Sequence, residues 1–171
     1  MADVALARRY AGGTRSLDGS GWALLSASLL ANIALAVACG WLGLFPISWR
    51  PDLVAPAGVA LGLAGLAIRY GAIATLGRQF TWRVTILDDH RLIEHGPFAW
   101  IRHPGYSGGL LAAYGIFLGL GTWLPVLTFS LTYVPLVLWR IRAEEAALER
   151  HFGEAYVAYR DKARALIPWV L

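Results

Sequence analysis

Charged residues are scarce in this chain of 171 residues: Asp, Glu, Lys and Arg together make up 15% of it, whereas soluble proteins average about 25%. No charge at all occurs between Asp18 and Arg50, and residues 104–139 form a second charge-free run. Each run exceeds the ~20 apolar residues that a helix needs to cross a bilayer. The composition therefore indicates an integral membrane protein.

Other chemical features are also missing. Cys39 is the only cysteine, so no disulfide can form within the chain. His90, Glu94 and His95 suggest a metal site, but the two histidines are five residues apart and no zinc-ligand spacing is present. We therefore expect no metal. No Gly-rich phosphate loop follows a strand, which excludes a soluble dinucleotide-binding fold. Membrane orientation explains the net charge of +4, so we also expect no nucleic-acid partner.

The apolar runs predict four transmembrane helices. Residues 22–45 give the first and about 53–77 the second. The 36 residues of 104–139 are too many for one ordinary span, and the Gly- and Pro-containing stretch 119–125 divides them into two helices of about 16 residues. The prediction is an all-α integral membrane protein with about four transmembrane helices and a C-terminal amphipathic helix.

Small residues of the second span, from Gly58 to Gly62, have the spacing of closely packed membrane helices and permit a dimer without requiring one. Beyond residue 139, apolar residues recur at spacings of three, four and seven, which is typical of an amphipathic helix. We expect Gly153 to interrupt that helix. Its apolar residues are Ile141, Leu148, Phe152, Tyr156, Tyr159 and Ala163.

We predict one membrane domain over residues 1–171, and its basic residues predict its orientation. Arg and Lys number three in the tail 1–20, four in the polar connection 78–103 and six in the segment 140–171. The turn after the first span contains only Arg50 and the stretch 119–125 contains none. With four spans the three basic segments lie on one side, which the positive-inside rule makes cytoplasmic. Both termini are therefore predicted to be cytoplasmic.

Two polar clusters on that side predict a binding site. The first is the segment 90–106, HRLIEHGPFAWIRHPGY, and the second begins at Arg140. Arg140 and Glu144 are four residues apart, so they share a helix face. A simple ion pair between them is one interpretation. The other is that both clusters meet at one membrane face and form a cofactor site, because polar groups within a membrane need partners.

The start of the third span adds an expected anion site. Pro104 favours the first position of a helix, which places His103 near the N-cap. The amides of Gly105 and Tyr106 would then point towards the polar connection, where a helix N-terminus favours an anion. Arg69, late in the second span, is expected either to extend to the interface or to line a polar cavity.

The C-terminal half contains several motifs at defined spacing. They are His90-x-Leu92-Ile93, Gly96-Pro-Phe98-x-Trp100-x-Arg102-His103-Pro104-x-Tyr106, Glu144-Glu145-x-x-Leu148-x-x-x-Phe152-Gly153-x-x-Tyr156-x-x-Tyr159 and a late Ile167-Pro168. Together they resemble the isoprenylcysteine carboxyl methyltransferase family, which includes phospholipid N-methyltransferase relatives. The resemblance covers residues 77–168.

This resemblance implies a methyltransferase that uses S-adenosylmethionine and releases S-adenosylhomocysteine. It also implies a lipid-like or prenylated small-molecule acceptor that enters from the bilayer, with its carboxylate as the expected methyl acceptor. Arg140 matches the position that approaches this carboxylate and is the implied catalytic residue. Arg83 matches a further, weaker cofactor position. The implied cofactor contacts are His90, Arg91, Leu92, Ile93, Phe98, His103, Pro104, Gly105, Tyr106 and Glu144.

The implied roles agree with the chemistry of these side chains. Glu144 suits the amino group of adenosylmethionine, His103 and helix amides suit its carboxylate, and aromatic faces suit its sulfonium or adenine. Phe98 replaces a tyrosine that is frequent in the family, so one hydroxyl is lost. A carboxylate acceptor is already ionised at neutral pH, which explains why no catalytic base stands out.

Two alternatives to this function remain open. An NADPH-dependent membrane reductase similar to the steroid 5-alpha-reductase group shares a related arginine-histidine-proline element. The paired glutamates, Glu144 and Glu145, followed by FGxxYxxY, favour the methyltransferase. The second alternative is a non-catalytic membrane scaffold, in which both polar clusters only contact lipid headgroups.

Overall fold

The computed structural model describes residues 21–80 and 91–167, and this part of the chain is mostly helical. It contains no β-strand within those ranges. The elements in chain order are α2 (Gly21–Leu42), α3 (Pro51–Leu76), the short 3-10 helices η1 (Gly77–Gln79) and η2 (Gly96–Ala99), α4 (Pro104–Gly119), α5 (Trp123–Phe152) and α6 (Glu154–Lys162). The expected all-α fold is confirmed.

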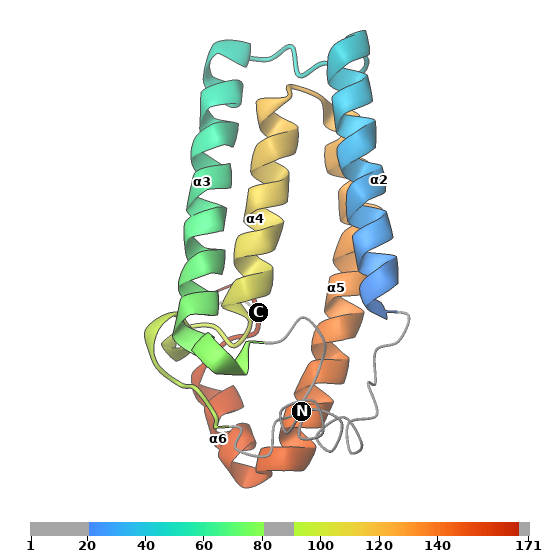
Figure 1. Cartoon of the computed structure of the whole chain (residues 1–171). Helices are drawn as coiled ribbons and strands as arrows, with labels where there is room; N and C mark the ends of the chain where they lie inside the picture. The colour runs from blue at the N-terminus through green and yellow to red at the C-terminus, as the bar shows by residue number, and fades with distance from the viewer. Residues whose placement is uncertain (1–20, 81–90, 168–171) are drawn as a thin grey trace, which may run out of the picture.

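Four long helices, α2 to α5, run side by side (Figure 1). Within the described residues, three stretches are long and apolar enough to cross a membrane: Gly21–Leu42, Pro51–Gln79 and Trp123–Phe152. α4 has 16 residues and completes the bundle by packing against both α3 and α5. Outward-facing side chains are apolar, and Trp41 is 88% exposed. Such a surface suits lipid, so the predicted integral membrane architecture is confirmed.

The break predicted at residues 119–125 is present, but the helix that follows is longer than expected. α5 has 30 residues and continues past Trp139 without interruption. The reason is that residues 140–152 are rich in Ala, Arg and Glu, which favour helix whether or not they lie in a membrane. Gly153, with a φ of 56°, ends α5, and α6 begins directly after it. The interruption predicted at Gly153 is confirmed.

Glycines allow α3 and α4 to pack with their backbones in close contact. Gly58, Gly62 and Gly65 of α3 are buried against α4. A Cβ atom added to Gly58 would lie 2.5 Å from the amide nitrogen of Gly119 and 2.8 Å from the carbonyl oxygen of Gly115. The predicted role of Gly58 and Gly62 in helix packing is confirmed.

A polar contact within the membrane joins α2 to α5. The side-chain amide of Asn32, a residue only 5% exposed, donates to Thr132 Oγ1 at 3.1 Å. Thr128 Oγ1 in turn donates to Asn32 Oδ1 at 2.8 Å. Hydrogen bonds between membrane helices replace contacts that lipid cannot supply. This contact therefore sets the register of α2 on α5.

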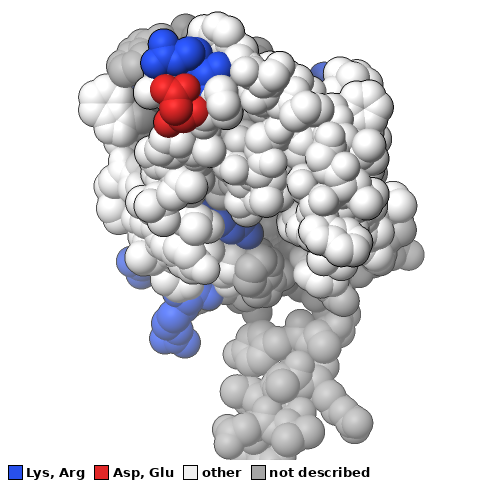
Figure 2. Space-filling view, turned by 90° about the horizontal axis from the view of Figure 1, so that it is seen from above, with Lys and Arg blue, Asp and Glu red and all other residues white. Residues whose placement is uncertain are grey.

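At one end of the bundle, the loop after α2 is hydrogen-bonded to the turn between α4 and α5. The Ile47 amide donates to the Gly121 carbonyl at 2.7 Å, and the Trp123 amide donates to the Phe45 carbonyl at 3.0 Å. Arg50 and Asp52 form an exposed ion pair at this end. Seen from this end, most of the described surface is uncharged (Figure 2). The polar clusters lie at the opposite end.

Candidate active site

A cavity of about 320 Å³ lies at the end of the bundle where α5 meets α6. One part of it is apolar and lies between the first turns of α2 and the last turns of α3. The other part is polar and aromatic, and is formed by residues 91–106 together with α5 and α6. One cavity therefore borders both the membrane helices and the polar clusters.

Every predicted site residue that the structure describes lines this cavity. His90 and Arg83 lie outside the described residues, so their predicted roles stay predictions. The predicted residues that line the cavity are Arg91, Leu92, Ile93, Phe98, His103, Pro104, Gly105, Tyr106, Arg140 and Glu144. The two polar clusters of the sequence thus meet at one place, as expected.

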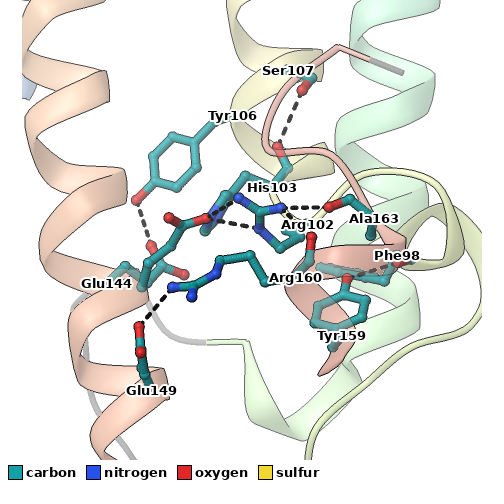
Figure 3. Close-up of polar contacts among 11 residues, drawn as sticks. Phe98, Arg102, His103, Tyr106, Ser107, Glu144, Glu149, Tyr159, Arg160 and Ala163 are labelled. Atoms are coloured by element: carbon teal, nitrogen blue, oxygen red, sulfur yellow. Dashed lines mark hydrogen bonds and ion pairs between the residues drawn. The ribbon is translucent and has the colours of Figure 1, made fainter. Parts of the chain in front are cut away.

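The Tyr106 hydroxyl lies between Arg140 and Glu144. It accepts a hydrogen bond from Arg140 Nε at 2.6 Å. It donates one to Glu144 Oε2 at 3.0 Å, which Figure 3 shows. Arg140 is only 5% exposed, although it lies just past the apolar part of α5. This connection through a residue of α4 replaces the simple ion pair that the spacing of Arg140 and Glu144 had suggested.

Glu145 holds the arginine-histidine pair that precedes α4. Its Oε1 lies 2.8 Å from Arg102 Nη2 and 3.1 Å from His103 Nε2. The side chains of Arg102 and His103 are 10% and 3% exposed, so the cluster is largely buried. The sequence patterns had not placed Glu145 in the site. The signal that could have found it is the match of two adjacent basic residues with two adjacent acidic residues.

The start of α4 agrees only partly with the expected anion site. Pro104 opens the helix and His103 is the N-cap residue, as predicted. The His103 carbonyl, however, accepts hydrogen bonds from the amides of Tyr106 at 3.0 Å and Ser107 at 3.1 Å. The Tyr106 amide is therefore engaged within the first helical turn, which argues against its expected role in binding an anion.

The segment after α6 runs back along the residues that precede α4. The Arg102 amide donates to the Arg164 carbonyl at 2.7 Å, and the His103 amide donates to the Ala165 carbonyl at 3.0 Å. The guanidinium of Arg102 also donates to the Ala163 carbonyl, and Ser107 Oγ donates to the Leu166 carbonyl at 2.5 Å. Residues 163–166, which we call the C-terminal strap, thus fix one wall of the cavity. No sequence motif had indicated this contact.

The charged residues that line the cavity are mostly basic. Arg69 reaches it from α3, where its Nη1 donates to the Gly105 carbonyl at 2.9 Å, so the expectation that Arg69 lines a polar cavity is confirmed. Among the described lining residues Glu144 is the only acid, against the arginines Arg69, Arg91, Arg102 and Arg140. Such a lining favours a ligand with an anionic group. No group of three metal-ligating side chains occurs in the described part of the chain.

These features define a class: a helical membrane protein whose bundle has, at one end, a cavity with a polar part and an apolar part. A model of the isoprenylcysteine carboxyl methyltransferase (ICMT) family matches residues 58–150. The match covers more than half of the chain, and the chain belongs to this family, whose members are carboxyl O-methyltransferases.

Individual relatives agree with this assignment. A rice protein named probable protein-S-isoprenylcysteine O-methyltransferase is 37% identical over 134 residues, which cover 74% of this chain and 68% of the relative. The fission yeast protein-S-isoprenylcysteine O-methyltransferase is 35% identical over 108 residues, covering 62% of this chain and 46% of the relative.

Among solved structures, a eukaryotic intramembrane Ras methyltransferase, ICMT, superimposes with a TM-score of 0.69 and 25% identity. The match covers 85% of this chain and 52% of that protein, so the present chain spans about half the length of that relative.

Proposed function

We propose that this protein is an S-adenosylmethionine-dependent methyltransferase that methylates the carboxylate of a prenylated acceptor in the membrane. The observation that carries the proposal is the single cavity that joins an arginine-rich, aromatic end to an apolar end between α2 and α3. A cofactor and a lipid-linked acceptor need such an arrangement, because the reacting groups must meet where polar and apolar surfaces adjoin.

The residues present fit the cofactor. A cavity of about 320 Å³ falls within the ~300–1,000 Å³ typical of small-molecule sites. Glu144 offers a carboxylate for the amino group, the arginine-rich lining suits the carboxylate, and Phe98 and Tyr106 offer aromatic faces for the adenine or the sulfonium. Bound at this place, adenosylmethionine would supply an activated methyl group.

Arg140 is proposed to bind and aim the acceptor carboxylate. It is buried, it lines the cavity, and the Tyr106 hydroxyl fixes the orientation of its guanidinium. An arginine in a site with little water holds an anion firmly, since the interaction is not screened. The carboxylate is ionised at neutral pH, so the site needs to orient it and exclude water, without a general base.

The apolar end supports a prenyl group as the other part of the acceptor. Leu25 and Leu29 of α2 and Ile73 and Leu76 of α3 line it. The names of the relatives refer to protein-S-isoprenylcysteine, so we propose a prenylated protein in place of the small-molecule acceptor expected from the sequence. These relatives are named as methyltransferases, which leaves the reductase alternative without support.

We further propose that the end of the bundle with the cavity faces the cytosol. The basic residues of the connection and of the C-terminal segment support this orientation. The only native cysteine, Cys39, is buried. A cysteine introduced at exposed Lys162 should therefore be labelled by an impermeant maleimide in inside-out vesicles but not in right-side-out vesicles.

The central test is binding and turnover in detergent or nanodiscs. Adenosylhomocysteine should bind in a calorimetric titration and NADPH should not. Labelled adenosylmethionine should transfer its methyl group to a prenylcysteine-terminated peptide and not to the same peptide without its prenyl group. Binding of NADPH alone would overturn the proposal.

One substitution tests the role of Arg140. Arg140→Ala should lower turnover by about 100-fold, because a charge-assisted contact to the acceptor is lost, while the affinity for adenosylhomocysteine changes little. Arg142→Ala is the matched control: Arg142 lies on the same helix but is exposed. A parallel loss of adenosylhomocysteine affinity in Arg140→Ala would assign the residue to the cofactor or to the fold.

A further inference from the structure

The hydroxyl of Tyr156 is buried without a partner. Tyr156 lies in α6, has a relative exposure of 0% and lines the cavity. Within the described residues, its Oη is the one buried side-chain nitrogen or oxygen that has no hydrogen-bond partner. Burying a hydroxyl without a hydrogen bond is unfavourable, so native proteins rarely do it unless a ligand or another group completes the contact.

Tyr159, the second tyrosine of the same motif, differs in this respect. It lies three residues further along α6, is also buried and also lines the cavity. Its hydroxyl, however, donates to the Phe98 carbonyl at 2.7 Å. Tyr159 therefore ties α6 to the segment before α4 through its hydroxyl, whereas the hydroxyl of Tyr156 has no such structural role.

The surroundings keep the Tyr156 hydroxyl protonated. Burial raises the pKa of Tyr156 above its ordinary value, and the charges of Glu145 and Glu144 raise it further, against the opposing charge of Arg102. The group therefore stays a neutral phenol that both donates and accepts a hydrogen bond. Tyr156 and Glu144, the residue that we assign to the cofactor, line the same cavity.

We propose that the Tyr156 hydroxyl forms a hydrogen bond to the S-adenosylmethionine held in this cavity. The inference rests on the proposed function and adds a binding residue to the site. It also gives the two tyrosines of the FGxxYxxY motif separate tasks: the first binds the cofactor, and the second holds the wall of the cavity.

The test is Tyr156→Phe, which removes the hydroxyl and keeps the ring, with Tyr159→Phe as the matched control. Without ligand, Tyr156→Phe should unfold at the same temperature as wild type or higher, since no existing hydrogen bond is lost. Its dissociation constant for adenosylhomocysteine, measured by calorimetry, should be about tenfold larger. Tyr159→Phe should instead lower the unfolding temperature of the ligand-free protein.

Each result has one meaning. If wild type binds adenosylhomocysteine and Tyr156→Phe binds it equally well, the assignment of Tyr156 is wrong and the proposed function stands. If ligand-free Tyr156→Phe is destabilised as much as Tyr159→Phe, the hydroxyl has a structural partner and the assignment is again wrong. If wild type itself does not bind adenosylhomocysteine, the proposed function fails and this inference fails with it.

Discussion

Glu145 is the single residue on which most of the buried charge before α4 depends. Its carboxylate pairs with the guanidinium of Arg102 and lies 3.1 Å from His103 Nε2, and both of these side chains are almost inaccessible to solvent. Glu145→Gln should therefore lower the free energy of unfolding by about 3 kcal/mol, since breaking a buried ion pair leaves an uncompensated charge. Denaturation followed by the fluorescence of the tryptophans would measure this loss.

The matched control is Glu149→Gln, one helical turn further along α5. Glu149 pairs with Arg160 at 2.8 Å, but these side chains are 43% and 38% exposed. An exposed pair contributes less than about 1 kcal/mol, so this variant should resemble wild type. Equal effects of the two substitutions would show that the arginine-histidine pair is held by the backbone contacts of the C-terminal strap alone.

Sequence patterns located the candidate site residues better than they located their partners. The motif that ends in Tyr106 and the spacing from Arg140 to Glu144 predicted which side chains line the cavity. They did not predict that Tyr106 would join Arg140 to Glu144, or that His103 would pair with Glu145. These pairings join residues about 40 positions apart, and their geometry depends on how closely α4 and α5 approach.

At the scale of helices, the contact between α3 and α4 is the feature most sensitive to added volume. Gly58→Ala should lower the thermal unfolding temperature, because its Cβ would overlap the backbone around Gly115 and Gly119 and push the helices apart. Gly71→Ala is the control in the same helix, since an added Cβ there meets no atom within 4 Å.

The control variant should be as stable as wild type or slightly more stable, because alanine favours helix by about 1 kcal/mol over glycine. Differential scanning fluorimetry in detergent compares the two. A stable Gly58→Ala protein would contradict the close backbone packing of α3 and α4.

The helices themselves were largely predictable because charge and glycine mark their ends. The apolar runs gave α2 and α3 within a few residues, and the Pro104 start and Gly153 break were both found. The length of α5 was not predicted. The return of charge at Arg140 marks where the apolar span ends, and it does not mark the end of the helix. Ala, Glu and Arg continue a helix beyond the membrane just as well as Leu continues it within.

At the scale of the whole chain, the C-terminal strap closes the site. A chain that ends at Lys162 lacks the carbonyl groups of residues 163–165, which accept hydrogen bonds from Arg102 and His103, and the Leu166 carbonyl, which accepts one from Ser107. It should lose measurable affinity for adenosylhomocysteine while keeping the helical circular dichroism of the membrane bundle. A chain that ends at Ile167 keeps the whole strap with all of these contacts and should bind like the full chain. Normal binding by the shorter chain would show that the strap is dispensable.

The pairing of α2 with α5 has a consequence for biosynthesis. Asn32 of α2 finds its threonine partners on α5, the last of the four bundle helices to be synthesised. Before α5 arrives, the Asn32 amide has only the Ser28 carbonyl of its own helix. α3 and α4, by contrast, are consecutive and meet at once. If synthesis stopped after α4, α3 and α4 could already pack together in the bilayer, whereas α2 would still lack its hydrogen-bonding partner α5.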